Sequence, residues 1–247
     1  MSPADLLAVV DLGSNSFRLE VARLEDNRLL SLLYRKETVR LAGGFAPDGT
    51  LTPEMQERAL SALTRFRECL AGVAPENILA VGTHAMRRAS QNAAFLCAAE
   101  RALGVPIEII SGEREASFAF SGAVRSLPYS AEERLVVDIG GGSTEMASGR
   151  GTTIGRSASY PVGCVSASIG FFPDGRITPD RQKAALEHAM TVLGDAAKTF
   201  PEASSSEAYM TAGTFRAVVE TCRNLGWTKE EVRLEHIEEL IARLLRS

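Results

Sequence analysis

The chain has 247 residues, of which 45% are hydrophobic and 23% charged, and its formal net charge is −4. These values are typical of a folded protein of one or two domains. The acidic balance argues against DNA and membrane surfaces as partners, because such binders usually carry excess lysine and arginine. No apolar run approaches the roughly 20 residues of a membrane span. Residues 1–5 show no export signal, and the four scattered cysteines form no Cys-x-x-Cys pair, so we expect a cytoplasmic protein with free thiols.

The chain begins with a strand that ends in an acid. Leu6 to Asp11 is apolar, Gly13 to Ser16 forms a small-residue loop, and Phe17 to Leu24 alternates like a second strand. The elements expected next are a strand over 29–39, a helix after the Thr52 cap, strands over 78–81 and 106–110, and helices over 92–103 and from Glu113.

A second strand with the same ending lies near the middle of the chain. Leu135 to Glu145 is an apolar run that ends in Asp138, followed by Gly140 to Ser143 and a short strand to Ser148. This pattern predicts a hairpin, because neither a Walker loop nor a Gly-x-Gly-x-x-Gly fingerprint opening a helix is present. Later we expect a strand over 153–161, helices over 164–169 and 179–200, a mobile loop over 204–206, a strand over 207–210, a small-residue loop over 211–214, and helices over 215–225 and 236–245.

The two strand endings form an internal repeat. Val9 to Gly13 aligns with Val136 to Gly140 at an offset of 138 − 11 = 127 residues, and Ser16 then aligns with Ser143. A repeat of this length predicts two related domains that face each other across a cleft. Because strands and helices alternate throughout, the fold class is α/β.

The repeated endings carry groups suited to phosphate chemistry. Phosphoanhydride hydrolysis needs charge neutralisation, an aligned water and usually Mg²⁺. Asp11 and Asp138 could supply the oxygen ligands that Mg²⁺ prefers, and the two loops could supply N–H and hydroxyl donors. Arg87 could bind a phosphate or lie on the surface. The candidate general bases are Glu113, Glu115 and Glu145, and the residues alone do not choose among them.

Six ordered motifs between Val9 and Gly226 resemble the exopolyphosphatase and guanosine pentaphosphate phosphohydrolase family, of the actin, hexokinase and Hsp70-like superfamily. They are Asp11-Leu-Gly-Ser-Asn-Ser16, Gly82-Thr-His-Ala-Met-Arg87, Ile110-Ser-Gly-Glu-Arg-Glu-Ala116, Asp138-Ile-Gly-Gly-Gly-Ser-Thr-Glu145, Pro161-Val-Gly-Cys164 and Ala212-Gly-Thr214. The resemblance implies two ribonuclease-H-like domains around a phosphate-binding cleft, expected at residues 1–124 and 125–247. Family members usually continue further, so the second domain is expected to lack its C-terminal elements, and a homodimer is a family expectation.

The resemblance also assigns roles. It implies Glu115 as the catalytic base and Arg87 as a catalytic phosphate ligand. The implied phosphate-binding residues are Gly13, Ser14, Asn15, Ser16, Gly140, Gly141, Gly142, Ser143, Gly213 and Thr214, and the implied Mg²⁺ ligands are Asp11, Asp138 and Glu145.

The resulting hypothesis is a Mg²⁺-dependent enzyme that releases terminal phosphate from inorganic polyphosphate, from guanosine pentaphosphate (pppGpp) in the stringent response, or from both. Two alternatives are a sugar kinase or ATPase of the same superfamily and a non-catalytic regulator that binds the alarmone or polyphosphate. Release of free phosphate from polyphosphate or pppGpp, without ATP-dependent phosphorylation of an acceptor, separates the main hypothesis from both.

Overall fold

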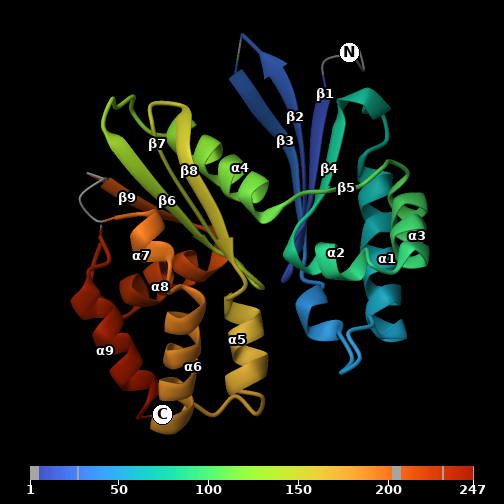
Figure 1. Ribbon diagram of the computed structural model, residues 1–247. Coiled ribbons are helices and arrows are strands. Elements are labelled where there is room, and N and C mark those ends of the chain that lie inside the picture. The colour runs from blue at the N-terminus through green and yellow to red at the C-terminus, as the bar shows by residue number, and fades with distance from the viewer. Residues whose placement is uncertain (1–5, 27, 202–206, 230, 247) are drawn as a thin grey trace. The chain divides into compact units, whose positions relative to one another are not determined.

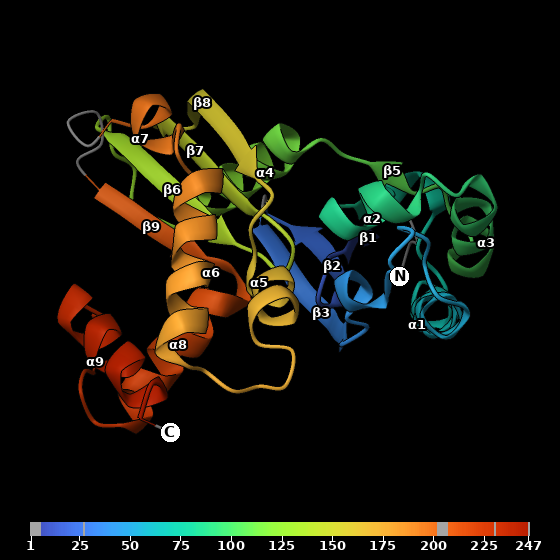
Figure 2. The same cartoon turned by 60° about the horizontal axis from the view of Figure 1, so that its bottom comes forward.

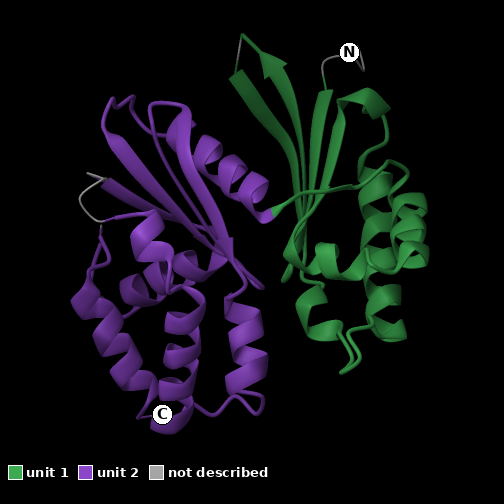
Figure 3. Ribbon diagram, in the orientation of Figure 1, with its two compact units in different colours: residues 1–111 green, residues 112–247 purple. Residues whose placement is uncertain are grey.

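The computed structural model describes residues 6–26, 28–201, 207–229 and 231–246. The loop expected over 204–206 lies outside these ranges. The chain divides into two compact units, Met1–Ser111 and Gly112–Ser247 (Figure 3). This division falls earlier than the expected 124/125 boundary, because helix α4 (Gly112–Arg125) packs against the sheet of the second unit. No helix in the described ranges combines the length and apolar character needed to cross a membrane.

The first unit is built on a five-stranded sheet in the order β3-β2-β1-β4-β5 (Figure 1). Its strands are β1 (Leu6–Leu12), β2 (Phe17–Glu25), β3 (Arg28–Glu37), β4 (Ile78–Gly82) and β5 (Glu108–Ile109). The first three strands are antiparallel, whereas β4 and β5 run parallel to β1. The fifth strand is shorter than the strand predicted over 106–110.

The helical segments of the first unit are η2 (Leu41–Gly44), α1 (Pro53–Cys69), η3 (Pro75–Asn77), α2 (His84–Ala89) and α3 (Ala93–Leu103). As predicted, Thr52 and Asn92 cap α1 and α3, and their side chains accept hydrogen bonds from first-turn N–H groups. Helices α1 and α3 lie side by side and enclose the core, in which Phe17 and Phe66 are fully buried (Figure 2). Helix α2 was not predicted.

The second unit has a four-stranded sheet in the order β8-β7-β6-β9. Its strands are β6 (Glu133–Ile139), β7 (Thr144–Arg150), β8 (Thr153–Tyr160) and β9 (Glu207–Thr211). Helix α4 covers one face, where Phe120 packs with Val136 and Ala147. The other helices are α5 (Cys164–Phe171), α6 (Pro179–Val192), α7 (Ala196–Thr199), α8 (Ala212–Asn224) and α9 (Leu234–Leu244).

Two predictions for the second unit were wrong. The helix expected over 179–200 ends at Val192, because Gly194 follows its last turn and glycine is a poor helix former; α7 then begins at Ala196. The small-residue loop expected over 211–214 is instead the end of β9 and the first turn of α8. Gly213 and Thr214 of the predicted loop therefore lie in the first turn of α8.

The repeat seen in the sequence is a structural repeat. Leu12 pairs with Phe17 in β1–β2, and Ile139 pairs with Thr144 in β6–β7, so four-residue loops connect both hairpins. Both loops are equally tight: a Cβ atom on Gly13 would lie 2.9 Å from the Ser16 carbonyl oxygen, and one on Gly140 would lie 3.1 Å from the Ser143 carbonyl oxygen. In each unit a later strand then runs parallel to the first strand of the hairpin.

Candidate functional site

The acids of the second hairpin lie directly opposite each other. Asp138 on β6 pairs with Glu145 on β7, so both side chains project from the same face of the sheet. Glu145 is only 2% exposed. Because carboxylates in this arrangement repel each other, and burial weakens screening by water, the pair is suited to a cation.

Each acid receives a hydrogen bond from a hydroxyl on a flanking strand. The Thr211 hydroxyl on β9 donates to Asp138 Oδ2 at 2.8 Å, and the Ser159 hydroxyl on β8 donates to Glu145 Oε1 at 2.7 Å. In the described ranges no cluster of three or more His, Cys, Asp or Glu side chains could hold a metal ion. An ion at this pair would therefore take its other ligands from water or substrate, as Mg²⁺ commonly does.

The loop beside the acids has its carbonyl groups held by helix α5. The Cys164 N–H donates to the Gly140 carbonyl at 3.0 Å, and the Val165 N–H donates to the Gly141 carbonyl at 2.8 Å. In a trans peptide the N–H points opposite to the carbonyl. The amides of Gly141 and Gly142 are therefore directed away from α5, in the manner of an anion-binding loop.

Helix α4, which bears Glu115, packs on the same face. Its residues Phe120 and Ala116 pack with Val136 and Ala147, and Val136 and Ala147 project from the face that carries the two acids. The N-terminal end of α4 is directed toward the end of the sheet where β6 turns into β7 (Figure 1). Glu115 is half-buried in this first turn. The second unit thus contains the predicted base and two of the three predicted metal ligands, and the helix that bears the base packs on the face that carries the two acids.

The equivalent loop in the first unit is tied to helix α2. Ser14 is buried, and its hydroxyl accepts a hydrogen bond from the Ala85 N–H at 3.2 Å. Its carbonyl accepts from the Ala42 N–H at 3.0 Å, and the Asn15 carbonyl accepts from the Arg40 N–H at 2.8 Å. Ser16 is also buried, and its hydroxyl has no hydrogen-bond partner among the residues that the structure describes.

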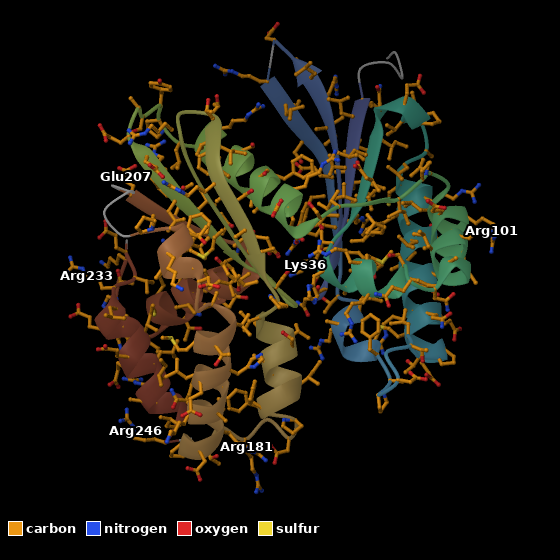
Figure 4. The ribbon with its side chains drawn as sticks, viewed as in Figure 1. Lys36, Arg101, Arg181, Glu207, Arg233 and Arg246 are labelled. Atoms are coloured by element: carbon orange, nitrogen blue, oxygen red, sulfur yellow. The ribbon has the colours of Figure 1, made fainter. Side chains whose placement is uncertain are left out.

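The first unit differs in charge at the row equivalent to the acid pair. Asp11 pairs with Arg18, which occupies the position of Glu145, and Arg18 pairs with Lys36 (labelled in Figure 4). Arg18 Nη1 donates to Asp11 Oδ2 at 3.0 Å. The predicted metal ligand Asp11 is thus engaged with a cation already present in the protein, and this row suits an anion better than the row in the second unit.

Arg87 is placed by α2 and held in position. Its Nη1 donates to the Ile110 carbonyl at 2.8 Å, at the end of the first unit. Its planar guanidinium presents five N–H donors, the geometry that recognises phosphate. The neighbouring Arg88 lies over the Phe45 ring, 4.1 Å from its centroid, and is exposed. The two arginines therefore have different environments.

His84 begins α2, one turn before Arg87. Burial lowers the pKa of His84, and the positive charges of Arg87 and Arg88 lower it further. The folded pKa lies below the unfolded value of 6.5, so the neutral histidine contributes stability above that pH, and this contribution is lost as the pH falls through the folded pKa.

We expect the free energy of unfolding to drop more between pH 8 and pH 5 in the unsubstituted protein than in His84→Gln. Urea unfolding at both pH values measures this, and equal drops would contradict it.

Gly213 and Thr214 lie in the first turn of α8. The N-cap residue Thr211 makes no side-chain cap, and helix N-terminal amides lack partners within their own helix. A Cβ atom on Gly213 would meet nothing within 4 Å. Both amides are therefore positioned in the way that anion-binding helix N-termini require.

Three polar residues of these sites were missed from the sequence. The sequence predicts Thr211 only as part of a small-residue loop and Arg18 only as one residue of a strand. It gives no indication of a role for Ser159. Each becomes visible only through strand register, which pairs Ser159 with Glu145 and Asp138 with Thr211.

Two α/β units that each carry a glycine-containing hairpin loop beside an acid define the actin-like ATPase fold. The comparisons agree. An exopolyphosphatase from Cytophaga hutchinsonii is 25% identical, with a TM-score of 0.85 over 98% of this chain and 80% of that chain. A putative exopolyphosphatase from Haemophilus influenzae is 34% identical over 98% of this chain and 74% of that relative. A guanosine-5′-triphosphate,3′-diphosphate pyrophosphatase from Vibrio parahaemolyticus is 33% identical over 95% of this chain but only 50% of that relative.

The family model for the Ppx/GppA phosphatase family matches residues 20–247. The chain belongs to this family. The family resemblance predicted from the six motifs is thereby confirmed, whereas the roles of individual residues stay predictions.

Proposed function

We propose that this protein is a Mg²⁺-dependent phosphohydrolase that releases terminal phosphate from inorganic polyphosphate, from pppGpp, or from both. The observation that carries the proposal is the acid pair Asp138–Glu145, which lies on the sheet face covered by the helix that bears Glu115. Family membership and the names of the relatives support hydrolysis over phosphoryl transfer to a sugar.

The acid pair fits Mg²⁺ through its chemistry. Two carboxylates with few further protein ligands match the way this ion is usually held in phosphoryl-transfer sites. When bound, the ion supplies charge neutralisation on the phosphoryl oxygens. Asp138 and Glu145 would hold it. The amides of Gly141 and Gly142 would bind the terminal phosphoryl group, which is released as phosphate.

Glu115 has the role of general base. Its carboxylate would take a proton from water while the water oxygen bonds to the terminal phosphorus and the bridging P–O bond breaks. Glu145 suits this role less well because it is buried and already accepts the Ser159 hydroxyl. Arg87 is proposed as a further phosphate ligand. A homodimer and a cytoplasmic location stay predictions from the resemblance and the composition.

The direct test is incubation of the purified protein and Mg²⁺ with polyphosphate and, separately, with pppGpp, followed by measurement of free phosphate. We expect release from at least one substrate and its loss when EDTA removes the metal. Tight binding without phosphate release would instead indicate the non-catalytic regulator. Phosphate release that survives EDTA would contradict the metal assignment but not the hydrolase.

A further inference from the structure

Four polar side chains form one row across the whole second sheet. Ser159 pairs with Glu145, Glu145 with Asp138, and Asp138 with Thr211. The row therefore reads hydroxyl, carboxylate, carboxylate, hydroxyl across β8, β7, β6 and β9. Both outer hydroxyls donate to the acid beside them, at 2.7 and 2.8 Å.

We propose that Ser159 and Thr211 are positioning residues that orient the acid pair for a divalent cation. The inference rests on the proposed function, since it concerns the same metal site. The terminal torsion of a carboxylate is broad and nearly two-fold. A hydroxyl bound to one oxygen fixes that torsion, so the pair is oriented before any ion arrives. Such outer partners are known to tune metal affinity strongly.

The use of the Thr211 hydroxyl supports this role. Thr211 is the N-cap residue of α8, a 13-residue helix, yet its side chain makes no cap hydrogen bond. Threonine at this position ordinarily accepts a bond from an N–H of the first turn. Here its hydroxyl donates to Asp138, so the rotamer of Thr211 is one that serves the acid and not the helix N-terminus. At the other end of β9, Glu207 accepts a hydrogen bond from Arg134 (Figure 4 labels Glu207).

The first unit provides an internal comparison. At the equivalent row positions it has Val81 where the second unit has Thr211, and Lys36 where the second unit has Ser159. There a single acid, Asp11, is bound by Arg18. The flanking hydroxyls thus occur in the row that has two acids and are replaced in the row that supplies its own cation.

The test measures Mn²⁺ binding without substrate, from the paramagnetic resonance signal of the free ion. Thr211→Val and Ser159→Ala each remove one hydroxyl, and valine already occupies the equivalent strand position in the first unit. We expect each variant to bind Mn²⁺ about tenfold more weakly. The Mg²⁺ concentration that half-saturates phosphate release should rise in parallel.

Two controls separate positioning from general damage. Thr211→Ser keeps the hydroxyl and should retain the affinity of the unsubstituted protein. Ser157→Ala removes a hydroxyl from the same face of β8, one row away opposite Ala147, and should leave Mn²⁺ binding unchanged. Urea unfolding of each variant verifies that the fold is retained.

The outcomes distinguish this inference from the proposed function. Unchanged Mn²⁺ affinity in Thr211→Val and Ser159→Ala, together with loss of binding in Asp138→Asn, would overturn the positioning role and leave the metal site standing. Failure of the unsubstituted protein to bind Mn²⁺ would overturn both the positioning role and the acid pair as a metal site. Phosphate release would still test the hydrolase separately.

Discussion

Glu115→Gln is expected to lower the rate of phosphate release by about 10²- to 10⁴-fold, the usual contribution of a positioned general base. Glutamine has nearly the same shape but accepts a proton poorly. The side chain is half-buried at the start of α4, while the residues that pack this helix are Ala116, Phe120 and Val124. Because the apolar contacts of the helix are kept, we expect the fold to be retained, with a loss of up to about 1 kcal/mol of unfolding free energy from the missing first-turn charge.

Glu113→Gln is the matched control. Glu113 lies in the same first turn of α4, but it is exposed, and it was an open alternative for the base. We expect this variant to retain most of the phosphate release. Equal losses in the two variants would show that the charge of the helix terminus, and not a proton transfer at Glu115, accounts for the effect. Full activity in Glu115→Gln would refute the assignment.

Gly163→Ala is expected to damage both the second loop and the stability of the second unit. A Cβ atom there would lie 2.6 Å from the Gly141 carbonyl carbon and 2.6 Å from the Gly142 nitrogen. These are backbone atoms of the proposed phosphate loop, so the loop itself must move. The φ of Gly163 is −148°, an extended value open to any residue, so the requirement for glycine is one of space.

The cost of such a clash is about 1 to 3 kcal/mol of unfolding free energy. Phosphate release should fall as well, because the Cys164 and Val165 bonds that hold the loop carbonyls would be displaced. Gly170→Ala is the control. Gly170 lies in helix α5, which begins directly after Gly163, and a Cβ atom on it would meet nothing within 4 Å. It should be neutral or stabilise by up to about 1 kcal/mol. Similar urea-unfolding midpoints for the two variants would contradict the steric argument.

Most local structure was predictable because it depends on neighbours in the chain. The caps at Thr52 and Asn92 depend on residues within one turn, and the strand endings at Asp11 and Asp138 depend on short apolar runs followed by small residues. The errors have the same origin. Gly194 disfavours the helix locally, but a single glycine is also tolerated within helices, so this signal alone does not decide where α6 stops. The first turn of α8 has the composition of a loop.

The sequence by itself determined the α/β class, the duplicated strand endings, the six motifs and hence the family. These features are encoded in residue order and spacing, which need no knowledge of register. Glu115 could be chosen over Glu113 only through the family motif.

Only the tertiary structure decided how the two halves of the repeat differ. Strand pairing places Glu145 opposite Asp138 in one unit and Arg18 opposite Asp11 in the other. It also brings Ser159 and Thr211 beside the acid pair, from positions 14 and 73 residues away from their partners. The register of a strand is set by packing of its buried face, which in the second unit lies under α4. A shift of one residue would reverse which side chains share that face. The charge of each row therefore follows from the fold and cannot be read from either strand alone.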